Sequence, residues 1–448
     1  MDITNTVLWE EIQQARDTGE NPVHFNYRIE IDTGEQLIHP RKLLSLDVTR
    51  QYNSRFADEI IATILMGEGS FSNLLYPHRD EFDVTLIKEP LTESKSSDNF
   101  ARESRSRRYR GSLVENRSNK ITGEHAQSSY TEDADRAGDN EYHIQLIDLA
   151  AEQLRLKNVG GVYRNMRAHE VIQGVLSMTS ADLDLDRDSA ILGVDVIEGD
   201  NQQQREHTII PHGTRSVDVA PYIQQQVAGV YRTGMGYYLQ NGIWYIYPQF
   251  NTRRFDKTDR NLTVVNIPPN RMPSIERTYF TDGDRVILIA TGETTHIDDS
   301  EAMQLNLGNA VRFVKAENVI EDFHEVDGNT ATAERAHNIE ELVVRQRRVG
   351  LNVAHFSPDR ILANEFQQLS DIARRIGSFI RTQWEESNPD LIYPGMPVRY
   401  VYQEGEILEE IFGIVMGVDH YVYDTRQGAV TGRYRCDAIL TLFLETTP

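Results

Sequence analysis

Four aspartates at alternate positions form the densest group of potential metal ligands in the sequence: Asp182, Asp184, Asp186 and Asp188. Carboxylates spaced in this way can bind calcium, but an EF-hand loop also needs glycine at its sixth position and glutamate at its twelfth. Neither residue stands in the required place, whether the loop is counted from Asp182 or from Asp184. The sequence therefore favours an acidic loop in solvent and leaves calcium as the alternative.

No other motif predicts catalysis. The sequence contains no His-Glu-x-x-His motif, no glycine-rich phosphate loop and no Gly-x-Ser-x-Gly elbow. The single cysteine, Cys436, excludes an intrachain disulfide and a cysteine-built zinc site. The 69 acidic residues leave a glycosidase-like carboxylate pair open, although no pair stands out. We therefore expect no catalytic residue, no cofactor and no metal.

An aromatic cluster surrounds an Asn-Gly pair between positions 237 and 247. Both residues of a type I′ turn need positive φ, so Asn241-Gly242 predicts a tight hairpin between two strands. The aromatic side chains could form a platform for a sugar or a base, with Trp244 at its centre. Aromatic hairpins more often belong to a core or an interface, and the sequence favours that interpretation.

Positions 91–140 contain nine serines, nine basic and nine acidic residues, with few apolar ones. Such a composition cannot offset chain entropy by burying a core, so it predicts a long, mobile, charged insertion. Its arginines precede its acidic residues, and guanidinium groups pair bidentately with carboxylates. We therefore take one set as a candidate partner-docking loop: Arg105, Arg107, Arg108 and Arg110.

The elements that would position these residues are mostly strands. Period-two patterns predict strands over 23–31, 42–49, 81–89, 142–146, 286–291, 398–402, 412–423 and 436–445. Apolar residues at helical spacing predict helices over 56–64, 168–178, 221–228 and 361–380. The pattern is typical of a β-rich α+β protein whose β regions flank a mixed middle.

The chain of 448 residues carries a formal net charge of −23. So acidic a surface repels phosphate, which argues against a general binder of duplex DNA or of an anionic membrane. No apolar run approaches the roughly 20 residues that cross a bilayer, and the first ten residues resemble no signal peptide. We expect a soluble chain, made in the cytosol, with no membrane partner.

Several stretches together resemble the tail-hub (baseplate hub) proteins of contractile-tailed bacteriophages. The likeness lies in the order of these stretches and in their general residue pattern, and it extends over most of the chain outside 91–140. It rests on residues 47–53, 56–58, 76–80, 84–86, 222–223, 231–235, 244–248, 393–398 and 413–418. The first of these stretches is Asp-Val-Thr-Arg-Gln-Tyr-Asn, and the 393–398 stretch is Tyr-Pro-Gly-Met-Pro-Val.

The resemblance implies an architectural virion protein in the tail or baseplate, synthesised in the host cytoplasm. Such hubs are homotrimeric rings whose subunits each contribute two tube-like antiparallel β-barrel domains, so that a sixfold tail tube is adapted to a threefold spike. The implied partners are the tail tube protein, the central spike protein and other baseplate proteins, and DNA would pass through the lumen without specific binding.

On this sequence the resemblance predicts four parts. They are an N-terminal segment at 1–19, a first β-domain at 20–158 that contains the insertion, a middle α+β region at 159–261 plus 301–390, and a second β-domain at 262–300 plus 391–448. The alternatives are another tail ring component, such as a distal tail or neck protein, a tail-associated cell-wall hydrolase, or a carbohydrate-binding module built on the aromatic hairpin.

Overall fold

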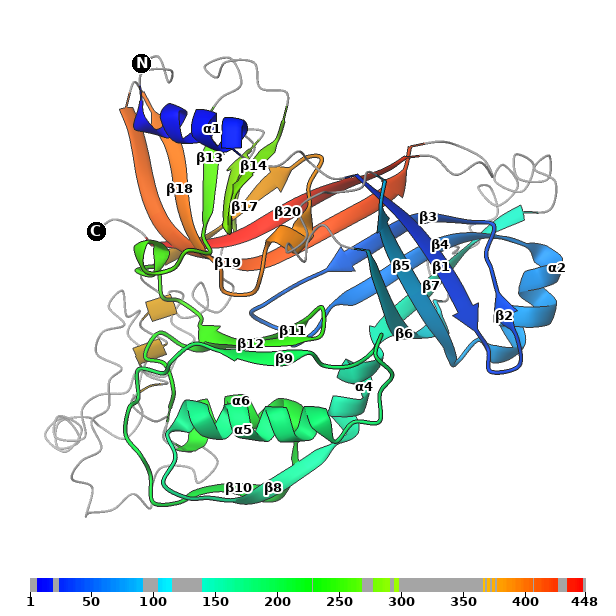
Figure 1. The fold of residues 1–448 in the computed structure, drawn as a ribbon, viewed down its shortest axis with the longest axis horizontal. Helices are drawn as coiled ribbons and strands as arrows, with labels where there is room; N and C mark the ends of the chain where they lie inside the picture. Colours follow the sequence, from blue (N-terminus) through cyan, green and yellow to red (C-terminus); the bar gives the residue numbers. More distant parts are fainter. Residues whose placement is uncertain are drawn as a thin grey trace, which may run out of the picture.

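The computed structural model is β-rich, with five α-helices in the part of the chain that it describes. The described residues are 6–18, 24–91, 104–114, 139–227, 229–267, 277–290, 294–297, 366, 369–370, 373–374, 377–405, 407–425 and 433–445. Figure 1 shows two β regions side by side, with a smaller α+β region against them. Within these residues, no helix is long and apolar enough to cross a membrane.

The first β region is an antiparallel array in the order β3-β4-β7-β6-β5-β1-β2. Alternate residues of its strands, such as Ile29, Ile31 and Ile64, face a common core, as expected for strands with one buried side. Helix α2 (Glu68–Ser70) lies at its far end. Its strands are β1 (Phe25–Asp32), β2 (Leu37–Ile38), β3 (Lys42–Thr49), β4 (Glu59–Gly67), β5 (Phe82–Pro90), β6 (Arg105–Leu113) and β7 (Asp139–Asp148).

The second β region mixes parallel and antiparallel pairs and is covered by helix α1 (Val7–Thr18). Leu8 and Ile12 of α1 share an apolar core with Val265 and Phe280, which fixes the helix on the sheet. The strands are β13 (Leu262–Asn266), β14 (Tyr279–Asp282), β15 (Arg285–Ile289), β16 (Thr294–Ile297), β17 (Gly377–Trp384), β18 (Pro397–Glu404), β19 (Ile407–Asp424) and β20 (Tyr434–Glu445).

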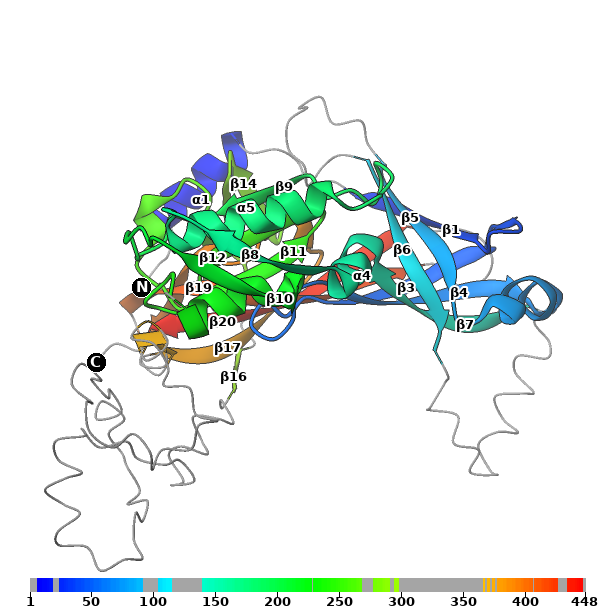
Figure 2. The same ribbon diagram turned by 90° about the horizontal axis from the view of Figure 1, so that it is seen from below.

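The two β regions form one sheet because strand β19 belongs to both. Its first half pairs with β18, residues 420–423 pair with β3, and β20 accompanies it from Gly413 to Asp424. The result is a 15-stranded sheet that runs across the molecule (Figure 2). The resemblance predicts two tube-like antiparallel β-barrel domains, whereas the strands of the described residues form one open sheet with two β regions. Strand β19, of 18 residues, is longer than one region needs and continues into the next.

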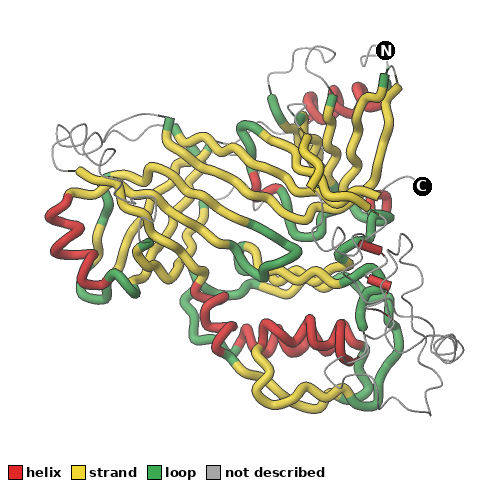
Figure 3. The backbone as a smooth tube through the Cα atoms, turned by 180° about the vertical axis from the view of Figure 1, so that it is seen from behind, coloured by secondary structure: helices red, strands yellow, loops and turns green. Residues whose placement is uncertain are grey.

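The middle region places helices between two small sheets. Helices α5 and α6 lie between the β11-β12-β9 sheet and the β8-β10 ribbon (Figures 1 and 3). Val171, Ile172 and Val175 of α5 share a core with Trp244 and Ile246 of β12. The elements are α4 (Leu149–Leu156), β8 (Asn158–Tyr163), α5 (Ala168–Ala181), β9 (Gly193–Val196), β10 (Thr208–Arg215), α6 (Val219–Tyr222), β11 (Met235–Gln240) and β12 (Ile243–Pro248).

The hairpin prediction is confirmed. Strands β11 and β12 pair in the expected register, and the turn residues Asn241 and Gly242 have φ of 52° and 78°. The helix predicted over 56–64 is wrong, since this stretch contains strand β4. Positions 56, 60 and 64 fit both a four-residue and a two-residue period, and β-branched isoleucines favour the strand.

The helix predicted over 361–380 is confirmed only where residues 366, 369–370 and 373–374 are helical, and its other residues before 377 lie outside the described part. From Gly377 onward the chain forms β17, which pairs with β20, so the last four predicted residues are strand. Strand β17 therefore joins the large sheet, although it falls within 301–390. The four domain boundaries themselves stay a prediction.

Candidate functional site

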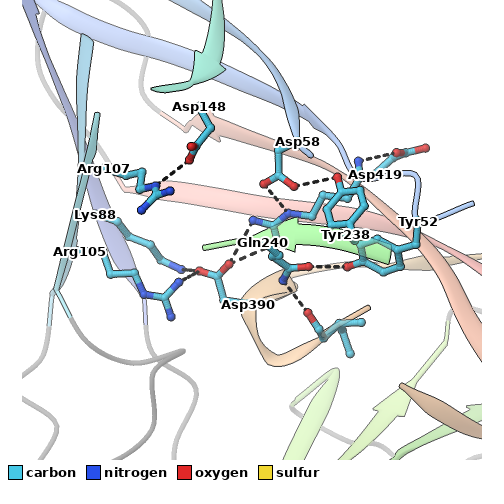
Figure 4. Close-up of polar contacts among 12 residues, drawn as sticks. Tyr52, Asp58, Lys88, Arg105, Arg107, Asp148, Tyr238, Gln240, Asp390 and Asp419 are labelled. Atoms are coloured by element: carbon cyan, nitrogen blue, oxygen red, sulfur yellow. Dashed lines mark hydrogen bonds and ion pairs between the residues drawn. The ribbon is translucent and has the colours of Figure 1, made fainter. Parts of the chain in front are cut away.

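A buried ionic network lies where the two β regions and the middle region meet, and we call it the junction (Figure 4). Arg50 follows β3, and Asp58 precedes β4. The Arg50 guanidinium donates to Asp58 at 3.0 Å, and the Arg50 backbone N–H donates to the Asp419 carboxylate of β19 at 3.2 Å. The Tyr238 hydroxyl of β11 donates to the other oxygen of Asp58 at 2.9 Å. Asp58 thus connects the first β region with the middle region.

Asp390 receives cations from three segments of the first β region. It sits on a short 3₁₀ turn, Pro389–Leu391, between β17 and β18. Lys88 of β5 lies 2.7 Å from one carboxylate oxygen, and Arg105 of β6 lies 3.4 Å from the same oxygen. Arg50 approaches the other oxygen at 3.3 Å. One carboxylate of the second β region therefore holds three positive groups of the first.

A neutral chain of hydrogen bonds runs beside the charges. The Tyr52 hydroxyl donates to the Gln240 side chain at 2.9 Å, and that amide donates to the Ile392 carbonyl at 2.9 Å. The Tyr52 ring also packs edge-to-face on Tyr238, with ring centres 4.8 Å apart. All three regions again take part, so the junction fixes their relative positions by both charge and packing.

Burial and charge oppose each other in this network. Burial alone would raise the pKa of Asp390, but Lys88, Arg105 and Arg50 hold that pKa well below its ordinary value. For Asp58 burial prevails over Arg50 and raises the pKa. For Lys88 burial prevails over Asp390 and lowers the pKa. The network is stable only while its charges are paired.

His420 of β19 lies beside this network. Burial lowers its pKa to about 3, and the Arg50 charge acts in the same direction. The imidazole is therefore neutral at physiological pH.

The geometry does not present a nucleophile or a general base. Both oxygens of Asp58 and both oxygens of Asp390 are already engaged, by Arg50, Tyr238, Lys88 and Arg105. A buried carboxylate in that state stabilises the positions of its partners and is not free to accept a substrate proton. In the described residues, no group of three or more His, Cys, Asp or Glu side chains could hold a metal ion.

The four arginines predicted as a docking loop lie on strand β6, between β5 and β7. They already pair with this chain. Besides Arg105, Arg107 reaches Asp148, the N-cap of α4, at 2.7 Å. Arg108 and Arg110 share Asp83 of β5, at 2.7 and 2.6 Å. The interpretation of 91–140 as one unpacked insertion is thus wrong for 105–113, because ion pairs replace apolar burial there. Docking on a partner stays a prediction.

The acidic run at 182–188 meets the same strand. Arg108 lies 2.6 Å from Asp186, and the Ser106 hydroxyl donates to Asp188 at 3.2 Å. Asp182 instead pairs with Lys157 at 3.3 Å. Each of these three carboxylates thus contacts a different side chain. Two charged motifs far apart in sequence therefore join the first β region to the middle region.

The aromatic hairpin is core. The Trp244 side chain is 0% exposed, and Tyr238 and Tyr247 are also buried. The prediction that favoured core over a ligand platform is confirmed, and Trp244 is not available to a sugar. Cys436 lies near the junction on β20, and burial raises the pKa of its thiol to about 11, so the thiolate is disfavoured.

Sequence reasoning missed Asp390 and Lys88 as members of a site. Arg50, Tyr52 and Asp58 lie in stretches that resemble tail hubs, yet no spacing rule assigned them a partner. Asp390 lies 340 residues from Arg50, and only the fold brings the two together. The one local signal was a lysine at an inward position of a strand, which requires a buried counter-charge.

No family model matches the sequence, and no curated protein matches it. Three solved structures align with more than nine tenths of this chain, at low identity. A tail protein from Neisseria meningitidis MC58 is similar with a TM-score of 0.41 and 11% identity, over 93% of this chain and 96% of that one. The 43 kDa tail protein of prophage MuSo2 from Shewanella oneidensis is similar with a TM-score of 0.39 and 8% identity, over 93% and 96%.

A third match is the c3393 protein of E. coli, with a TM-score of 0.42 and 8% identity, over 94% of this chain and 77% of that one. That protein is a component of the type VI secretion system and is itself structurally similar to the T4 bacteriophage tail proteins gp27 and gp5.

Proposed function

We propose that this chain is a structural protein of a bacteriophage tail and serves as the hub of the baseplate. The observation that carries the proposal is the junction. Several stretches that resemble tail hubs contribute to it or lie beside it. Arg50, Tyr52 and Asp58 come from the first stretches. Met396, six positions after Asp390 and buried in the same core as Tyr52, comes from the 393–398 stretch. The resemblance therefore concerns residues that fix the β regions, which is what an adaptor must do.

In the proposed assembly, three copies form a ring between the tail tube protein and the central spike protein. Each copy would offer its two β regions to the tube, and other baseplate proteins would bind around the ring. DNA would pass through the lumen without specific binding, because a chain of net charge −23 repels phosphate. The proposed role is not enzymatic, because the charged side chains of the junction pair with one another and hold strands together.

Copy number and position in purified tails test this proposal. We expect quantitative mass spectrometry to find three copies per tail, and a gold label on this chain to lie at the end that carries the spike. Six copies or one copy per tail would contradict the trimer. A label at the head-proximal end would identify a neck component instead, and absence from washed tails would contradict a structural role altogether.

A further inference from the structure

The β8-β10 ribbon lies on the side of the middle region that points away from the large sheet (Figure 1). Among the described residues, two apolar side chains are exposed on its outer face. Its inner residues, such as Ile210 and Tyr163, pack on the core of α5 and α6. On the outer face, Val162 and Ile209 are direct cross-strand partners. Their side chains are 54% and 58% exposed. Two exposed apolar side chains that lie side by side offer a small apolar contact for a partner.

The segments that contain and flank the ribbon are basic, although the chain as a whole is strongly acidic. Residues 155–167 and 204–215 contain six basic residues and one acidic residue, against a net charge of −23 for the chain. Arg164 directly follows the last residue of β8, Tyr163, and is exposed at this end of the ribbon. Arg164 and Arg205, just beyond the ends of β8 and β10, form no ion pair with any residue that the structure describes. This end of the ribbon thus offers positive charge for which the described residues supply no counter-charge.

One edge of the ribbon is open to a further strand. In the described part of the chain, β8 pairs with β10 alone. Sheet edges are usually protected by charges, proline or bulges. Strand β10 has such protection, with Pro211 and a register shift between Ile210 and Thr214. Strand β8, Asn158–Tyr163, contains neither proline nor a charged residue.

We propose that β8 accepts an extended, acidic segment of a partner protein as a third strand of this ribbon. The backbone would supply the hydrogen bonds, and alternate side chains of the added strand would lie beside Val162 and Arg164. Because Arg164 comes two positions after Val162, at the end of β8, we expect the partner segment to carry an apolar residue and a carboxylate two positions apart. The inference does not depend on a role in a phage tail.

A peptide tests the chemistry on the full-length chain. The probe is a fluorescein-labelled peptide of about ten residues with the repeat Val-Thr-Glu-Thr, so that valine and glutamate are two positions apart. We expect its fluorescence anisotropy to rise with protein concentration, and the affinity to fall as salt is added. A peptide with lysine in place of glutamate should not bind. Equal binding of the two peptides, or no binding of either, would overturn the proposal.

Two variants with the same charge change distinguish binding at the ribbon from attraction by the net charge of the whole protein. Arg164→Glu is expected to weaken binding of the glutamate peptide by about tenfold or more. Arg187→Glu, on an exposed loop outside the ribbon, should leave it nearly unchanged. Circular dichroism checks that both variants are folded, and neither position lies in the core. An equal loss in both variants would show that net charge alone attracts the peptide.

Amide hydrogen exchange distinguishes strand addition from docking on the apolar face. Strand addition should slow exchange at the unpaired amides of β8 when the peptide is bound, whereas a ligand on the face leaves those amides as they were. Binding without this protection would overturn strand addition. Concentration-dependent dimerisation that Val162→Asp abolishes would show instead that a second copy of this chain covers the ribbon.

Discussion

Asp390→Asn is expected to destabilise the protein strongly while hardly changing its shape. The substitution removes the charge that Lys88, Arg105 and Arg50 approach at 2.7, 3.4 and 3.3 Å. Lys88 keeps its contact over the Phe25 ring but loses its carboxylate. Breaking a buried ion pair from one side costs about 3–5 kcal/mol, because the remaining charge stays buried. We therefore expect a loss of this size in the free energy of unfolding.

Urea unfolding of the full-length chain measures the effect. Trp244 and Trp384 are buried in the middle and second β regions, so their fluorescence reports on both. Asp184→Asn makes the same chemical change at an exposed loop position and serves as the control. A second substitution, Lys88→Met, should recover part of the loss when added to Asp390→Asn, since it removes the uncompensated cation.

The effect of Asp390→Asn also depends on pH. Because the folded pKa of Asp390 lies below its unfolded value, its contribution is complete above about pH 4 and is lost as pH falls through the folded pKa. The variant and the wild type should therefore converge in strong acid. A loss at neutral pH below about 1 kcal/mol, or one equal to that of the control, would refute the view that the junction holds the regions together.

Three further outcomes are expected. His420 has a folded pKa of about 3, so the free energy of unfolding should fall as pH drops from about 6.5 toward 3, by about 2 kcal/mol at pH 5. The urea midpoint, measured as a function of pH, should show this fall. In His420→Gln the midpoint should change less over the same pH range. Gly395 has φ of 73°, and a β-carbon there would overlap a buried tyrosine ring. Gly395→Ala should therefore lower the melting temperature more than Gly34→Ala. At Gly34, φ is 81° but the space around a β-carbon is open. Lys42 and Asp424 form an ion pair at 3.0 Å, with side chains 0% and 1% exposed. Lys42→Met alone should therefore lower the free energy of unfolding by about 3–5 kcal/mol, and the double variant with Asp424→Leu should lower it less. A double-mutant cycle measures the difference.

Most strands could be predicted because one buried face imposes period two on the sequence. The stretch 42–49 is the clearest case, since the predicted bounds and those of β3 coincide. Strand β4 was misassigned because its inward residues, Ile60 and Ile64, are also four apart. The shared strand β19 could not be recognised, since its pattern is the same whether its two halves pair with one sheet or with two.

The junction lay beyond sequence reasoning for a different reason. Its charges come from segments hundreds of residues apart, and no local period marks a buried ion pair. Strand β6 shows the difficulty well. Its arginines suggest a solvated insertion, yet Arg107 and Arg110 form ion pairs with Asp148 and Asp83 of the same chain. Composition measures how much apolar surface a segment can bury, but not which counter-charges the fold will bring to it.

Strand β19 has a mechanical consequence. Its 18 residues extend over about 60 Å, and β20 is hydrogen-bonded to it through most of that length. A push on the β18 end is transmitted along covalent backbone, and the bonds to β20 resist it in shear, many at a time. A flexible linker would absorb the same push by bending. The two β regions must therefore tilt together as the arms of a lever, so that a displacement imposed on one arm sets the displacement of the other.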